Sequence, residues 1–195
     1  MLRLAFLASN NGSAMRAIVN AISARSLNAQ ARLLVSNKET SSALAFAREN
    51  AVPTRVIPTF PDPEIADQTL CETLTSANVD CVILSGYLRK LGPRTLTRFA
   101  GRILNTHPAL LPKFGGKGMY GRRVHETVLA AGERVTGVTI HLVDGEYDHG
   151  AIIAQRSVPI PDGASVEAVE KLVMDAEPLV FIETLQRIAA GQLRL

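Results

Sequence analysis

The sequence predicts an α/β fold, with a central and mostly parallel sheet, helices on both of its faces, and an added antiparallel ribbon in the C-terminal half. The first half of the chain alternates short apolar runs with segments of helical periodicity, as parallel strands and their crossover helices do. The run 79–86 is almost continuously apolar, which is typical of a strand buried on both faces. Beyond residue 135, two runs of alternating polarity follow each other across a glycine-containing turn, which predicts an antiparallel pair.

The first helix has the clearest signal. Met15, Ile18, Val19 and Ile22 recur at the spacing of one helix face, and Ser13 precedes them as the expected N-cap. This helix is expected to cover the strand before it, with a right-handed crossover to the next parallel strand.

The remaining elements follow from the same patterns. The last helix is expected from Ser165 to about Ala190, with Gly191 as its stop and Pro178 as a kink or restart. The earlier helices are expected at 14–25, 41–50 and 64–77. The strands are expected at 2–9, 31–37, 54–59, 79–86, 102–105, 136–144 and 151–160.

Composition predicts a single cytoplasmic domain. A chain of 195 residues with 47% apolar and 20% charged residues suits one domain, 1–195, in which 1–100 is expected to bind phosphate and 101–195 to carry the reactive groups. The net charge of +3 is spread along the chain, so nothing demands nucleic acid as a partner. Neither a secretory signal nor a membrane-spanning run is recognisable, and Cys71 and Cys81 are expected to be free thiols.

The segment LASNNGSAM joins the first strand to the first helix. Gly12 can adopt positive φ and lets the backbone approach a ligand, while the N–H groups of the helix point at that ligand. We therefore expect Asn11, Gly12, Ser13 and Ala14 to bind a phosphate monoester, and a plain tight turn is the alternative. Neither GxGxxG nor GxxxxGKS occurs here, so the common dinucleotide and P-loop fingerprints are absent.

Asn105 and His107 lie two residues apart at the end of an apolar run, so in an extended segment both side chains project from one face. Pro108 keeps His107 out of the helical region. An amide donor beside a protonated imidazole is suited to stabilising an oxyanion. Asp148, in the turn 144–150, is expected near His107, where it would favour the protonated ring and shuttle a proton. The alternatives are a structural histidine and a solvated acidic turn, and no histidine spacing predicts a metal site.

Six segments in order carry a resemblance to a known family: LASNNGS, VSNK, ILSGYLRKLGP, ILNTHPALLPKFGG, TGVTIHLVD and YDHGAIIAQ. Over nearly its whole length the chain resembles the folate-dependent formyltransferases, and its NGS loop resembles that of the phosphoribosylglycinamide formyltransferases. The resemblance implies a Rossmann-like formyltransferase fold. It also implies transfer of the formyl group of 10-formyltetrahydrofolate to the glycinamide amine of 5′-phosphoribosylglycinamide in purine (IMP) biosynthesis. The resemblance further implies that the substrates are small molecules, that no metal takes part, and that the protein is a monomer or homodimer.

The resemblance further implies three groups of site residues. The catalytic group is Asn105, His107 and Asp148. The phosphate contacts are Gly12, Ser13 and Ala14. The folate-binding group consists of Leu88, Arg89, Lys90, Leu91, Asn105, Asp144, Gly145, Glu146, Tyr147 and Asp148. Within it, Leu88 and Leu91 would supply apolar walls, and backbone groups would form hydrogen bonds with the pterin.

The chain departs from the family at two places. On the last helix, Val173 and Met174 replace a Glu-His pair whose carboxylate helps to bind the ribonucleotide, unless Asp175 or Glu177 takes its place. The segment 60–66 has acids and prolines where a basic residue often meets the folate tail.

The loop KFGGKGMYGRRVHETVL follows the catalytic segment. Its glycines are expected to let it close over substrate, and His125 is expected to have a structural role. The bond Leu111–Pro112 is expected to be cis, because the chain must turn sharply there.

Three other functions are open at this point. A formyltetrahydrofolate deformylase would share Asn105, His107 and Asp148, although such enzymes usually carry an additional N-terminal domain. A formyltransferase could instead act on an amino sugar or on methionyl-tRNA, but the NGS loop favours a monophosphate. A nonenzymatic nucleotide-binding module would not need all three polar residues.

Overall fold

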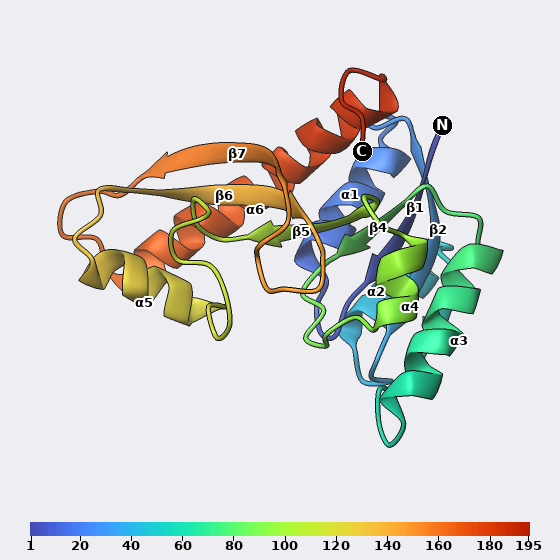
Figure 1. The fold of residues 1–195 in the computed structure, drawn as a ribbon. Helices are drawn as coiled ribbons and strands as arrows, with labels where there is room; N and C mark the ends of the chain where they lie inside the picture. Colours follow the sequence, from blue (N-terminus) through green and yellow to red (C-terminus); the bar gives the residue numbers. More distant parts are fainter.

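A computed structural model describes residues 1–195 and places all seven strands in one sheet, in the order β3-β2-β1-β4-β5-β6-β7 (Figure 1). Strands β1 to β5 pair in parallel, and β6 and β7 add to them as an antiparallel ribbon. The strands are β1 (Leu2–Leu7), β2 (Ala29–Ser36), β3 (Thr54–Val56), β4 (Cys81–Leu84), β5 (Ile103–His107), β6 (Val135–Leu142) and β7 (Ile152–Pro159). The predicted fold class is confirmed.

Helices cover both faces of this sheet. The larger apolar core joins α1 (Ser13–Ser23), α2 (Ser42–Glu49) and α6 (Val166–Ala189) to one face. On the other face, α3 (Pro63–Ser76) and α4 (Pro93–Arg98) close a second core. Helix α5 (Arg122–Ala130) buries Val124 and Val128 against Ala109 beyond the end of β5. Because both faces of the sheet centre are covered, all four residues of β4 are buried, as the sequence predicted for this strand.

The start of α1 differs from the prediction. Gly12 occupies the N-cap position with φ 64° and ψ 49°, and Ser13 is the first helical residue, so Ser13 is not the N-cap. No side chain caps this end, and Met15 N–H donates to Ser85 Oγ at 2.9 Å. The backbone N–H groups of Gly12, Ser13 and Ala14 have no intramolecular partner. An N-terminus left open in this way is ready to receive an anion.

Other differences are local. Helix α6 runs unbroken through Pro178, so the predicted restart there is wrong. The short helices α4 and α5 had no predicted range. Leu111–Pro112 is cis as expected, and Phe60–Pro61 is cis as well. No helix combines the length and apolarity that crossing a membrane would require.

The strand order places the candidate site. Chain direction across the sheet reverses between β1 and β4, because β1 leads outward to β2 and β3 while β4 leads to β5. In doubly wound sheets ligands bind outside the carboxyl ends of the strands at such a switch point. The loops that follow β1, β4 and β5 therefore meet at one edge.

Candidate active site

Asn105 and His107 project from the same face of β5, as their spacing predicted, and each lies opposite a polar residue of β6. Asn105 pairs with His141, and His107 pairs with Thr139. Asn105 Nδ2 lies 3.2 Å from His141 Nε2. His141 Nδ1 donates to the carbonyl of Leu142 at 2.9 Å, and its Nε2 lies between the Asn105 amide and Asp148. The second Asn105 amide hydrogen has no protein acceptor.

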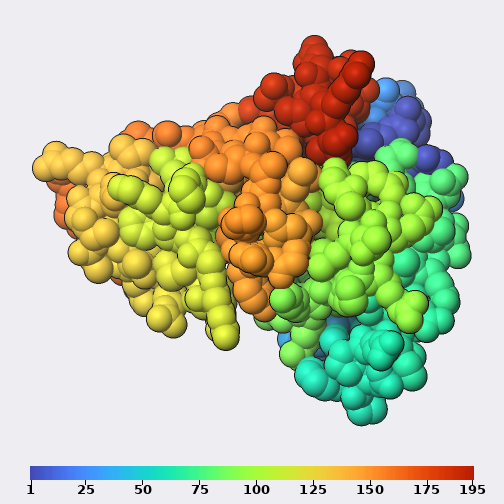
Figure 2. All heavy atoms as spheres, in the orientation of Figure 1, coloured from blue at the N-terminus to red at the C-terminus, as the bar shows by residue number.

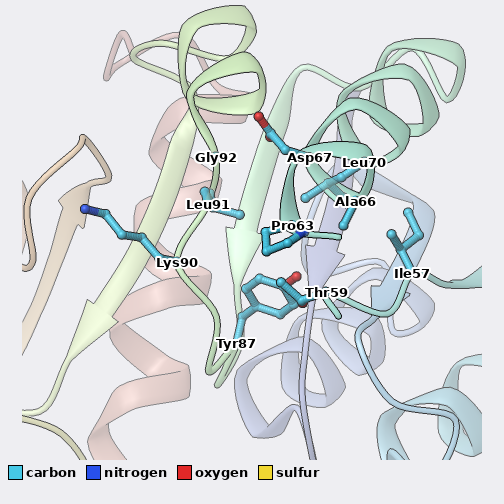
Figure 3. A pocket seen from close by; sticks show the side chains of 10 residues that line it. All are labelled: Ile57, Thr59, Pro63, Ala66, Asp67, Leu70, Tyr87, Lys90, Leu91 and Gly92. Atoms are coloured by element: carbon cyan, nitrogen blue, oxygen red, sulfur yellow. The ribbon is translucent and has the colours of Figure 1, made fainter. Parts of the chain in front are cut away.

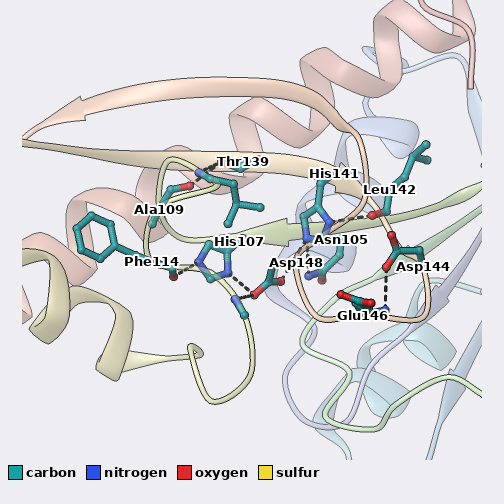
Figure 4. Close-up of polar contacts among 12 residues, drawn as sticks. Asn105, His107, Ala109, Phe114, Thr139, His141, Leu142, Asp144, Glu146 and Asp148 are labelled. Carbon is teal, nitrogen blue, oxygen red and sulfur yellow. Dashed lines mark hydrogen bonds and ion pairs between the residues drawn. The ribbon is translucent and has the colours of Figure 1, made fainter.

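The His107 ring is 3% exposed and is held on both sides (Figure 4). Its Nε2 donates to the carbonyl of Phe114 at 2.8 Å. Its Nδ1 lies 3.4 Å from Asp148 Oδ2. The structure thus brings Asp148 to His107 from a turn 41 positions further along the chain, as the sequence predicted.

Asp148 is fixed by its surroundings. Its Oδ2 accepts from the N–H of Gly116 at 3.0 Å, and its Oδ1 lies 3.5 Å from His141 Nε2. The residue adopts φ 55°, a left-handed conformation that is uncommon for non-glycine residues. Burial would raise the pKa of Asp148, but contacts with His141, His107 and the Gly116 N–H together hold that pKa below its ordinary value. Asp148 is therefore a carboxylate at neutral pH.

The protonation of His107 differs from the expectation. Asp148 raises the pKa of His107, as expected, but burial has the larger effect and the resulting pKa lies below the ordinary value. The resting ring is therefore neutral at neutral pH, with its proton on Nε2. A proton gained at Nδ1 would lie between the ring and the carboxylate.

His141 is a site residue that the sequence analysis missed. The alternation of β6 marked it only as part of the polar face of a ribbon. Its role depends on the register Asn105↔His141, which makes it the bridge between Asn105 and Asp148. One sequence feature could have indicated it: the polar residues Thr139 and His141 have the same two-residue spacing as Asn105 and His107.

The loop after β1 is held by its neighbours. Ser9 Oγ donates to Asn37 Oδ1 at 2.6 Å and accepts from Leu88 N–H at 2.8 Å, which ties this loop to the segment after β4. Lys38 Nζ donates to Asn10 Oδ1 at 2.8 Å, so a cation lies beside the open N-terminus of α1. A Cβ on Gly12 would come within 3.1 Å of Ala43 Cβ. The loop is thus hydrogen-bonded to the segments after β2 and β4 and leaves little room at Gly12.

The segment after β4 and the turn 144–148 face each other. Lys90 Nζ lies 5.9 Å above the ring of Tyr147. Leu91 is buried in the second core, and Leu88 is 57% exposed. Figure 2 shows the orange atoms of the β6–β7 turn between the green segment after β4 and the yellow-green loop after β5.

A pocket lies beside the segment after β4, against α3 (Figure 3). Tyr87, Leu91 and Gly92 form one wall of this pocket. The side chain of Lys90 points away from Tyr87. Arg89 does not line this pocket, and its guanidinium lies 5.2 Å from the ring centroid of Phe60. The other lining residues are Ile57, Thr59, Pro63, Ala66, Asp67 and Leu70.

Two acids of α6, Asp175 and Glu177, lie close in sequence to the Val173–Met174 pair at which the chain differs from the family. Val173 is fully buried in the core, and Met174 is exposed. Asp175 lies 2.8 Å from Lys171 in a surface ion pair. Glu177 is half-buried with no hydrogen-bond or ion-pair partner, and burial raises its pKa to about 7.

His125 is buried on α5 and its Nδ1 has no partner. Burial lowers its pKa, and Glu170 of α6 opposes that shift. Arg122 joins α5 to α6 through ion pairs with Glu167 and Glu170. No group of three or more His, Cys, Asp or Glu side chains is arranged to hold a metal ion.

These features define a class: a doubly wound α/β protein with an uncapped helix N-terminus, an amide and a histidine–carboxylate pair at the switch point of its sheet. Comparison with known families places the chain further. The family described as formyl transferase matches residues 2–185, and the chain belongs to that family.

Individual relatives agree with this. The chain is 38% identical over 195 residues to a chloroplastic phosphoribosylglycinamide formyltransferase of Arabidopsis thaliana, covering 98% of this chain and 67% of that one. It therefore spans about two thirds of the length of this plant relative. To the phosphoribosylglycinamide formyltransferase of Haemophilus influenzae it is 34% identical, covering 100% of this chain and 91% of that protein. The crystal structure of glycinamide ribonucleotide transformylase 1 from Symbiobacterium toebii superimposes with a TM-score of 0.91 at 30% identity, over 100% of this chain and 91% of that one.

Proposed function

We propose that this protein transfers the formyl group of 10-formyltetrahydrofolate to the glycinamide amine of 5′-phosphoribosylglycinamide, a step of purine (IMP) biosynthesis, in the cytoplasm. The observation that carries the proposal is the convergence of Asn105, His107 and Asp148 at the sheet edge that also holds the open N-terminus of α1. We further propose that the reaction needs no metal and that the protein acts as a monomer or homodimer.

Asn105 stabilises the oxyanion in this proposal. When the neutral amine attacks the formyl carbon, negative charge develops on the formyl oxygen. Asn105 Nδ2 lies 3.2 Å from His141 Nε2, and an amide hydrogen that no protein group accepts is available to that oxygen. A preformed donor of this kind lowers a barrier by about 3 kcal/mol.

His107 and Asp148 handle the proton. The attacking nitrogen must lose a proton, and the leaving folate nitrogen must gain one. His107 Nδ1 is unprotonated at rest and faces Asp148, so the pair accepts the first proton, through water, as the tetrahedral intermediate forms. The imidazolium then stabilises the oxyanion beside Asn105 and returns the proton to the leaving nitrogen.

The substrates are held on either side of this trio. The free N–H groups of Gly12, Ser13 and Ala14, together with Asn11 and the dipole of α1, bind the phosphate. Residues 88–91 and 144–148, with Asn105, bind the folate.

Glu177 is the acid of α6 that remains free to meet the ribonucleotide. It is unpaired, and α6 packs on α1 in the same core. Substitution Glu177→Gln should raise the KM for the ribonucleotide and leave the KM for the folate unchanged, and equal effects on both would contradict this role.

Deformylation is the alternative activity, since a deformylase needs the same trio to activate water. The two are separated by following release of folate from 10-formyltetrahydrofolate by absorbance, with and without the ribonucleotide. Release that requires the ribonucleotide supports the proposal. Release without it identifies a hydrolase, and no release under either condition identifies a binding module.

A further inference from the structure

A row of polar side chains crosses the three antiparallel-paired strands from His107. In the sheet register, His107 of β5 lies opposite Thr139 of β6, and Thr139 lies opposite Gln155 of β7. Side chains directly opposite each other share a face and are close enough to touch. Gln155 therefore lies on the active-site face, two strands away from His107.

Thr139 and Gln155 fasten the segment that follows His107. The Thr139 hydroxyl, fully buried, donates to the carbonyl of Ala109 at 2.6 Å and accepts from Leu111 N–H at 3.1 Å and from Gln155 Nε2 at 2.9 Å. The same Gln155 amide donates to the carbonyl of Leu111 at 2.9 Å. Two side chains from the ribbon thus hold residues 109–111 (Figure 4 shows the Thr139–Ala109 contact).

The chain that follows residues 109–111 contacts the ring of His107 again. Three residues beyond Leu111, the carbonyl of Phe114 accepts the hydrogen bond from His107 Nε2 at 2.8 Å. A carbonyl oxygen only accepts, so this bond fixes the proton on Nε2 and leaves Nδ1 as the atom that titrates beside Asp148. The position of Phe114 therefore decides the tautomer of His107.

We propose that Gln155 is a positioning residue for His107 and acts through Thr139, Leu111 and Phe114. Without its amide, the Leu111 carbonyl and the Thr139 hydroxyl lose their shared donor, and the segment 109–114 is held only by the two bonds of Thr139 to Ala109 and Leu111. The Phe114 carbonyl is then less firmly placed, and the ring is less firmly held in one tautomer. The effect on turnover rests on the proposed function, whereas the effect on the tautomer does not.

The test replaces Gln155 by Leu, which keeps the size of the side chain and removes the amide. We expect kcat to fall between about tenfold and a hundredfold, with the KM of each substrate changed less than about twofold. Gln30→Leu is the matched control, because Gln30 is an exposed strand glutamine with no side-chain hydrogen bond, and it should behave as wild type. Thr139→Ser keeps the hydroxyl and should retain activity, while Thr139→Val should resemble Gln155→Leu.

Long-range 1H–15N NMR of the His107 ring supplies a measurement that needs no substrate. Wild type should show one tautomer with the proton on Nε2, and Gln155→Leu should show a mixture of tautomers. If Gln155→Leu is unfolded, Thr139→Val provides the same comparison. A folded variant of either kind with wild-type kcat, or with an unchanged tautomer, would overturn the proposal. A changed tautomer in a protein that lacks formyl transfer would support the positioning role and reject the proposed function.

Discussion

His107 lies where burial and charge have opposite effects. Burial lowers the pKa of the imidazole and Asp148 raises it, and the lower value prevails. A neutral ring can accept a proton during the reaction, while the adjacent carboxylate stabilises the cation that forms. In the proposed mechanism the two residues therefore function as one proton-transfer unit, and Asn105 remains a donor throughout.

Removing His107 tests this unit. His107→Ala should lower kcat by about a hundredfold or more, because both the proton acceptor and the stabilising cation are lost. The dissociation constant for folate should stay unchanged, since the ring is closed in by Phe114 and Asp148. Steady-state kinetics and equilibrium titration measure the two quantities, and a weakened folate affinity with normal kcat would contradict the assignment.

The pH profile tests the role of Asp148. Since the pKa of His107 lies below the ordinary histidine value, kcat should be constant near neutrality and fall on the acid side as the resting ring becomes protonated. Asp148→Asn removes the charge that raises this pKa, so the acid limb should move to lower pH while the plateau decreases. An acid limb that moves to higher pH would contradict the pairing.

Glu177 makes stability depend on pH. Burial raises its pKa from 4.5 to about 7, so its contribution to stability is fully present below pH 4.5 and is lost as pH rises through 7. Glu177→Gln should therefore increase the free energy of unfolding at pH 8 by about 2 to 3 kcal/mol and change it little at pH 4.5. Asp175→Asn, at an exposed ion pair, should change it by no more than about 0.5 kcal/mol at either pH. Denaturant titration at both pH values measures this, and an equal effect of Glu177→Gln at both would refute it.

Among the elements, the turn between β1 and α1 has the most specific sequence requirement. Gly12 combines φ 64° with a close approach to Ala8, Met15 and Ala43. The turn is held to its neighbours through Ser9, so the open N–H groups cannot readily move aside.

A methyl group at Gly12 should therefore weaken phosphate binding. Gly12→Ala should raise the KM for the ribonucleotide at least about tenfold and cost roughly 1 to 2 kcal/mol of stability. Gly132→Ala is the matched control, since Gly132 has φ 70° and open space around it. It should show a similar loss of stability with unchanged KM. If both variants had the same KM, the turn would not be the phosphate site.

Most elements could be predicted because each has a local signal. Strands β1 and β4 are apolar runs, and α1 and α6 are long enough to show a helical period. Helix α4 is only six residues long, which is too short for a period to show. The N-cap was placed one residue late, because a glycine with positive φ took the position that the serine side chain was expected to fill. His141 was missed because strand register is not visible in the sequence.

For the whole molecule, sequence pattern predicted the fold class and the convergence of distant residues. Alternating strands and helices imply parallel pairing, and parallel pairing brings the ends of β1, β4 and β5 to one edge. Asn105, His107 and the first loop could be expected there on this basis. The position of Asp148 next to His107 depends on the pairing of β6 with β5, because Asp148 lies in the turn between β6 and β7. The hydrogen bonds of Thr139 and Gln155 to residues 109–111 depend on the same ribbon.

The central claim is that this edge transfers a formyl group to an amine and not to water. A single turnover with tetrahydrofolate carrying a 13C-labelled 10-formyl group, in the presence of 5′-phosphoribosylglycinamide, follows the carbon directly by NMR. The account predicts that the label appears as the N-formyl carbon of the ribonucleotide, at a rate lowered by about a hundredfold or more in His107→Ala. Label appearing as free formate, or reaching the amine equally fast without His107, would contradict it.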